Sequence, residues 1–223
     1  MNLRTLFTIA SLTLSVASAA GSPGTDAGEA LVNRFVSDVT TLSARFEQRL
    51  IDASGEILEV SSGTLDISRP GRFRWAYIEP YEQWLVADGV NIWSYDIDLL
   101  QVTVKPQHEA LANTPALLLG GSDDVMSGFN YDGSYEAGGL TWARLRPIDT
   151  DSGFKRVELA FSDGELARMV FLDNLEQTTI VSLYEVRVNE SIDASRFEFV
   201  VPEDVDVVGT PATALNISPD DPR

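Results

Sequence analysis

The stretch Arg69-Pro70-Gly71-Arg72-Phe73-Arg74-Trp75-Ala76-Tyr77 decides how the chain is organised. Pro70-Gly71 is typical of a tight turn, because proline presets φ at the first central position and glycine accepts the positive φ that often follows. Beyond the turn, apolar and polar residues alternate, which places Phe73, Trp75 and Tyr77 on one face and Arg72, Arg74 and Ala76 on the other. The stretch therefore predicts a turn and then a half-buried strand with one aromatic and one cationic face.

The same alternation extends from this stretch in both directions. Runs at 44–50 and 57–68 precede it, and runs at 83–87 and 91–95 follow it, joined by the hairpin dipeptide Asp88-Gly89. Later runs cover 99–105, 140–146, 154–161, 165–172 and 178–188, and Phe197, Phe199 and Val201 alternate in a last run. Because sequential strands joined by short turns favour antiparallel pairing, the sequence predicts a mainly β fold with a long, strongly curved sheet.

Two segments predict short helices. Asp26 and Glu29 have the spacing of a capping box, and Leu31, Phe35 and Val39 then recur every four residues on one helix face. The second segment, 114–121, has Pro115 at the first helical position, three consecutive leucines and a glycine stop. Because three adjacent leucines cannot share one helix face, this helix is either buried on all sides or covers a cavity.

The ends of the chain predict processing. Residues 1–19 combine one basic residue, a short apolar run and the small residues Ala17-Ser18-Ala19, a pattern typical of a cleaved secretory leader. The apolar run is shorter than the roughly 20 residues that a membrane span needs. We expect 20–209 to form a single domain and 210–223, which is rich in Pro, Asn, Ser and Asp, to form a disordered tail.

Charge and residue usage exclude several classes of function. The formal net charge of −18 disfavours nucleic acid and anionic lipid headgroups as partners. The absence of cysteine excludes disulfides, thiolate metal sites and a lipid-modified cysteine, so we expect no membrane anchor. His108 is the single histidine, and neither a nucleophile elbow nor a phosphate-binding glycine loop occurs. We therefore expect no catalytic residue, metal site or cofactor, and a cavity for an apolar ligand is the function that remains.

An ordered set of motifs resembles the periplasmic outer-membrane lipoprotein carrier family, LolA. The set comprises Gly63-Thr64-Leu65, the stretch 69–75, Asp88-Gly89, Asn113-Thr114-Pro115 and Val205-Asp206-Val207. The resemblance implies an incomplete, half-open antiparallel β-barrel of about eleven strands, with a lid of short α-helices over an apolar cavity. It also implies a monomeric periplasmic chaperone that catalyses no reaction. Such a carrier accepts acylated lipoproteins from an inner-membrane ABC-type release complex and passes them to an outer-membrane acceptor lipoprotein.

The resemblance also implies roles for particular residues. Arg69 matches the family's arginine, which would hold the lid closed by donating hydrogen bonds to main-chain carbonyls. Phe73 matches the phenylalanine that contacts acyl chains, and we expect Trp75, Leu117, Leu118, Leu119, Leu31 and Phe35 to share that role. Ala116 departs from the family, which commonly has a larger apolar residue there. The alternative is a periplasmic binding module of the same half-barrel shape that senses lipid or protein.

Overall fold

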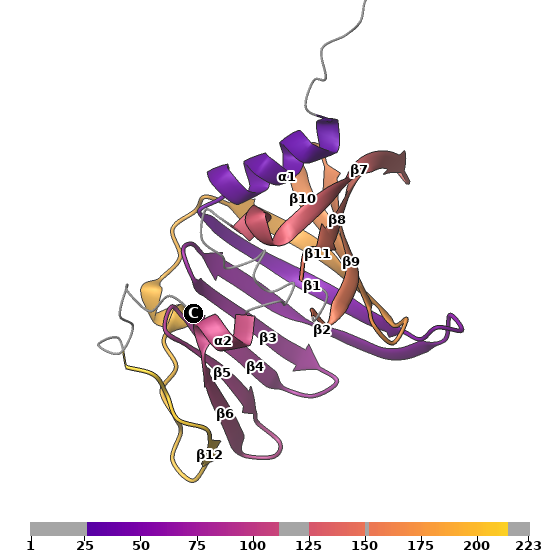
Figure 1. Ribbon diagram of the computed structural model, residues 1–223. Coiled ribbons are helices and arrows are strands. Elements are labelled where there is room, and N and C mark those ends of the chain that lie inside the picture. Colours follow the sequence, from indigo (N-terminus) through magenta and orange to yellow (C-terminus); the bar gives the residue numbers. More distant parts are fainter. Residues whose placement is uncertain (1–25, 112–124, 150–151, 214–223) are drawn as a thin grey trace, which may run out of the picture.

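A single open sheet dominates the molecule. The computed structural model describes residues 26–111, 125–149 and 152–213. Its strands form one 12-stranded sheet in the order β12-β6-β5-β4-β3-β2-β1-β11-β10-β9-β8-β7, so β12 and β7 are the two edges. Figure 1 shows the sheet bending strongly, with β7–β9 turned toward the side on which α1 and α2 lie. The predicted fold class, a mainly β incomplete barrel, is confirmed.

The elements are as follows. The helices are α1 (Ala27–Asp38), α2 (Gln107–Leu111) and the short 3-10 helices η1 (Val125–Gly128) and η2 (Ala194–Phe197). The strands are β1 (Thr41–Ile51), β2 (Ile57–Ser68), β3 (Arg72–Glu79), β4 (Gln83–Asp88), β5 (Asn91–Asp96), β6 (Gln101–Pro106), β7 (Phe129–Ala137), β8 (Leu140–Pro147), β9 (Phe154–Ser162), β10 (Glu165–Asp173), β11 (Thr178–Val188) and β12 (Asp206–Val208).

Three elements differ from the prediction. The alternation at 197–201 forms no strand, because Phe197 ends η2 and Phe199 packs its ring against Trp93 on the sheet. The sequence pattern predicts no strand at 129–137, where β7 forms, because a register shift between Tyr131 and Ser134, with Gly133 at φ +89, interrupts the alternation. The third is β12, a short strand that pairs in parallel with β6, whereas we expected antiparallel pairing throughout.

The N-terminal helix forms where the capping pattern predicts it. The Asp26 carboxylate accepts a hydrogen bond from the Gly28 backbone N–H at 3.0 Å and another from the Ser134 hydroxyl of β7. These two donors hold the pKa of Asp26 below its ordinary value. A Cβ at Gly28 would lie 2.5 Å from the Ser134 Cβ, so the glycine lets the helix approach β7 closely. The helix start is thereby fixed to the far edge of the sheet.

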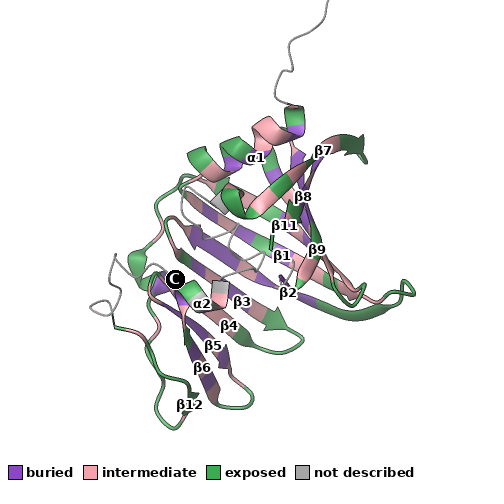
Figure 2. Ribbon diagram, in the orientation of Figure 1, coloured by how far each residue is buried: buried purple, intermediate pink, exposed green. Residues whose placement is uncertain are grey.

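The two faces of the sheet are covered differently. On the concave face, α1 contributes Val32 and Phe35 to a large apolar cluster that draws on β1–β5 and β8–β11. On the convex face, a smaller cluster around Trp93 and Tyr95 is covered by Phe199 and Val205 of the C-terminal segment. Figure 2 shows buried positions alternating with more exposed ones along these strands.

Part of the predicted C-terminal tail also packs on the sheet. Ala212, within the described residues 210–213, exchanges two hydrogen bonds with the Asn91 side chain. The rest of that tail and the predicted leader lie outside the described residues.

An ion pair fastens the C-terminal segment to the convex face. Asp66 of β2 is 6% exposed, and its carboxylate accepts hydrogen bonds from the Arg196 guanidinium of η2 and, at 2.9 Å, from the Ser43 hydroxyl. Arg196 is partly exposed, whereas Asp66 is not. Loss of the carboxylate would therefore leave two donors without their acceptor.

Asp66→Ala is expected to lower the free energy of unfolding by about 2 kcal/mol, below the full cost of breaking a fully buried pair because Arg196 can still reach water. Urea denaturation measures the change. The control is Glu47→Ala, which breaks the exposed Arg49–Glu47 pair and is expected to cost less than about 1 kcal/mol. Equal costs for the two variants would contradict a structural role for the Asp66 contact.

Candidate functional site: the concave face and its arginine

The stretch 69–77 folds as its alternation predicts. Gly71 adopts φ +79 in the turn between β2 and β3. Phe73 and Trp75 then point into the concave apolar cluster, whereas Arg74 points to the convex face, where its guanidinium lies 4.2 Å from the centre of the Trp84 ring. The aromatic side of β3 is thus the inner side of the sheet.

Arg69 joins the sheet to the end of α1. Its Nη1 donates hydrogen bonds to the backbone carbonyls of Phe35 at 2.6 Å, Val36 at 2.9 Å and Val39 at 3.0 Å. The guanidinium also lies 4.7 Å from the centre of the Phe35 ring. The last carbonyls of a helix lack partners within the helix and carry its negative dipole end, so a cation is well placed there.

A glutamine that pattern reading missed braces the turn beside Arg69. Gln107, at the start of α2, is 9% exposed. Its Nε2 donates to the Gly71 carbonyl at 2.7 Å, and its Oε1 accepts from the Gly89 N–H at 3.0 Å. One side chain therefore ties the β2–β3 turn to the β4–β5 turn. Nothing in the local sequence signals this, because all three residues are distant in the chain.

The inner side of β3 is the centre of an aromatic group. The Phe46 ring packs edge-on against Trp75 at 5.3 Å and against Tyr77 at 5.2 Å between ring centres. Gly63 makes this packing possible, because a Cβ there would lie 1.9 Å from the Ala76 carbonyl oxygen and 3.0 Å from the Phe46 ring. The indole Nε1 of Trp75 is buried and has no acceptor among the described residues.

The structure brings most of the predicted site residues onto one surface. Phe73 is 0% exposed, Trp75 is 7% exposed and Phe35 is 4% exposed, and Leu31 packs partly buried against the same cluster. The ring of Phe35 also meets Phe161 of β9 at 6.4 Å, so α1 contacts the far half of the sheet. Leu117, Leu118 and Leu119, with the rest of the predicted second helix, lie outside the described residues.

His108, the single histidine of the chain, is exposed in α2. In the described ranges, no three or more His, Asp or Glu side chains gather closely enough to hold a metal ion. Within the same ranges, no helix has the length and apolar character required to cross a membrane.

A family model and the relatives of this chain carry the same description. Residues 37–200 match the family model described as outer membrane lipoprotein carrier protein LolA. Three relatives are named outer-membrane lipoprotein carrier protein. The one from Dechloromonas aromatica is 39% identical over 78% of this chain and 84% of its own length. The one from Azotobacter vinelandii is 43% identical over 75% and 81%. The one from Ralstonia nicotianae is 40% identical over 86% and 93%.

A solved structure shares the fold at low sequence identity. It is an uncharacterized conserved protein from Thermus thermophilus, with a TM-score of 0.51 and 17% identity over 80% of this chain and 94% of that one. The likeness concerns the fold of the backbone alone.

Proposed function

The chain belongs to the outer-membrane lipoprotein carrier family, LolA, and carries lipoproteins, and we propose a route and a mechanism for this transport. It works in the periplasm as a monomer, accepts acylated lipoproteins from an inner-membrane ABC-type release complex and passes them to an outer-membrane acceptor lipoprotein. It catalyses no reaction, because transfer requires only binding and release.

One observation carries the mechanism: Arg69 holds the end of α1 by three backbone carbonyls above an apolar face on which Phe73 is wholly buried. An acyl chain can reach Phe73 only when the cover over this face moves. We therefore assign Arg69 the role of a latch, since its single side chain connects the sheet to the cover. Its guanidinium remains charged and carries five N–H donors, of which those on Nη1 reach all three carbonyls.

The acyl-binding surface comprises Phe73, Trp75, Phe35 and Leu31, and on the family resemblance it includes Leu117, Leu118 and Leu119. The acyl chains of the cargo are long enough that their exposure to water during transfer is very unfavourable. At about 0.8 kcal/mol per buried methylene, exposing a chain of about fifteen methylenes to water costs on the order of 12 kcal/mol. Spontaneous release into water would be far too slow, so cargo must pass directly between partners.

The latch also sets the direction of transfer. When a cover competes with lipid for the same face, the apparent affinity is the intrinsic affinity multiplied by the fraction of molecules that are open. An acceptor without such a latch therefore binds the cargo more tightly and takes it from the carrier. The buried Trp75 N–H supplies a donor that an ester carbonyl at the head of an acyl chain can occupy.

The experiment is a binding series with synthetic diacylated lipopeptides of increasing chain length. Each added pair of methylenes is expected to tighten binding by about tenfold until the face is filled, and the unacylated peptide is expected not to bind. Intrinsic tryptophan fluorescence or native mass spectrometry measures the affinity. Binding that does not depend on chain length would contradict a lipid carrier and favour a protein-sensing module.

A further inference from the structure

The inner face of the sheet changes character along its strands. Close to α1 its inward positions are apolar, as at Leu65, Phe73 and Ala87. Toward the other ends of the same strands the inward positions become polar, and a pocket of about 520 Å³ opens there. The polar residues that line this pocket include Gln48, Glu59, Ser61, Tyr77, Asp96 and Asp98.

The pocket is acidic. Glu59 of β2, Asp96 of β5 and Asp98 in the following turn contribute three carboxylates to its lining, and none of the lining residues is Lys, Arg or His. A ligand that placed a cationic group in this pocket would meet negative side chains and no positive ones among the lining residues. A ligand with a carboxylate would be repelled.

An unpartnered buried hydroxyl also faces the pocket. Ser61 is 3% exposed, lines the pocket, and its Oγ has no hydrogen-bond partner among the described residues. Buried hydroxyls are normally paired, because an unpaired one costs free energy of folding. A polar ligand in the pocket would supply the missing partner, and this observation is independent of the carboxylates.

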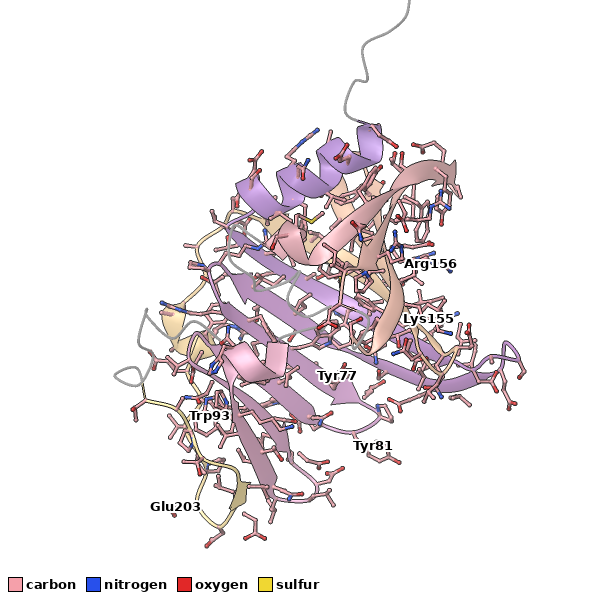
Figure 3. The ribbon with its side chains drawn as sticks, viewed as in Figure 1. Tyr77, Tyr81, Trp93, Lys155, Arg156 and Glu203 are labelled. Carbon is pink, nitrogen blue, oxygen red and sulfur yellow. The ribbon has the colours of Figure 1, made fainter. Side chains whose placement is uncertain are left out.

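Tyr77 connects this pocket to the apolar face. Its ring stacks on Trp75 at 6.2 Å and meets Phe46 at 5.2 Å, while its hydroxyl donates to the Gln48 Oε1 at 3.2 Å inside the polar lining. Burial raises the pKa of Tyr77 to about 12, so the hydroxyl remains protonated at neutral pH. Figure 3 shows Tyr77 and Tyr81 at this end of the sheet, away from α1.

We propose that this acidic pocket binds the first polypeptide residues of the lipoprotein cargo, with a cationic side chain preferred, while the acyl chains lie on the adjoining apolar face. The inference rests on the proposed carrier function. A lipoprotein changes from apolar to polar where its acylated residue meets the polypeptide. The inner face changes in the same order, from the Trp75 ring through Tyr77 to Ser61 and Glu59. The matched order gives both parts of the cargo a complementary surface.

The test uses the full mature chain and two diacylated lipopeptides that differ only in the residue after the acylated one, which is Lys in one and Glu in the other. We expect the wild-type protein to bind the Lys peptide about fivefold more tightly, as befits two partly exposed ion pairs, and added salt to reduce the difference. The double variant Glu59→Gln/Asp96→Asn is expected to bind the two peptides equally.

The control is Asp163→Asn/Glu165→Gln, which removes the same charge from exposed residues at the β9–β10 turn, beside Arg34 of α1 and therefore at the other end of the molecule from the pocket. It is expected to keep the fivefold preference. Equal affinities in the wild type, or a preference that survives in Glu59→Gln/Asp96→Asn, would overturn the inference while leaving lipid binding intact. If neither lipopeptide bound at all, the carrier function itself would fail.

Ser61→Ala tests the hydroxyl separately. It is expected to weaken binding of both lipopeptides by about threefold, because one neutral hydrogen bond to the cargo is lost. The midpoint of thermal unfolding of the empty protein is expected to stay the same or rise, since the variant removes an unpaired buried hydroxyl. Unchanged affinity, or weaker binding that merely follows a lower unfolding midpoint, would contradict direct contact between Ser61 and cargo.

Discussion

Arg69→Leu is expected to keep its fold, to load lipoprotein and to fail to pass it on. The variant loses all three hydrogen bonds to the carbonyls of Phe35, Val36 and Val39. If the net contribution of this latch is about 2 kcal/mol, its loss raises the fraction of open molecules and tightens lipid retention by roughly 30-fold. A transfer assay from loaded carrier to acceptor-containing membranes measures the retained fraction.

Two further variants separate the latch from a general effect of charge. Arg72→Leu makes the same chemical change on an exposed residue at the start of β3, and it is expected to transfer cargo normally. Arg69→Lys keeps the charge but lacks the planar fork, so it is expected to give intermediate retention. Normal transfer by Arg69→Leu would show that Arg69 does not act as a latch.

Phe73→Glu is expected to abolish loading, with at least a tenfold lower rate of lipoprotein uptake. Phe73 is 0% exposed in the apolar cluster, so a carboxylate there has no polar partner and repels an acyl chain. The same burial means that the substitution also lowers the free energy of unfolding, by roughly 3–5 kcal/mol. Uptake is therefore measured on the fraction that circular dichroism shows to be folded.

Two comparisons keep this prediction independent of stability. Phe73→Leu retains an apolar side chain and is expected to load at close to the wild-type rate. Phe199→Glu places the same charge in the convex cluster, where the Phe199 ring of the wild type stacks on the Trp93 ring with 5.3 Å between ring centres. It is expected to destabilise the protein without impairing loading. Wild-type uptake by folded Phe73→Glu protein would show that Phe73 does not lie on the path of the lipid.

The alternation pattern predicted a mainly β fold with one long curved sheet because most strands are long and joined by short turns, and the family resemblance added the half-open barrel. The alternation of Phe73 and Trp75 correctly predicted which side of β3 is buried. The same reasoning missed β7, because the register shift between Tyr131 and Ser134, with Gly133 at positive φ, interrupts its alternation. It also failed at 197–201, where Phe197 ends η2 and Phe199 packs its ring against Trp93 on the convex face of the same sheet, because a side chain can alternate without backbone pairing.

The site was predictable only in part, for a physical reason. Arg69 and Phe73 lie within one short motif, so a family resemblance could assign them roles. Gln107 and Ser61 depend on contacts between distant segments, which no local pattern encodes. The acceptors of Arg69 also could not be predicted locally, because they lie about 30 residues earlier in the chain, at the end of α1. The acidic pocket likewise appears only when β1, β2, β3 and β5 are placed side by side.

Photocrosslinking is the sharpest test of whether acyl chains lie on the concave face. The mature protein is loaded with a lipopeptide whose acyl chain ends in a photoreactive group, irradiated and mapped by mass spectrometry. We expect crosslinks to concave residues such as Phe46, Leu65 and Phe73, and more of them in Arg69→Leu. Crosslinks confined to the convex cluster around Trp93 and Phe199, or to neither face, would contradict this expectation.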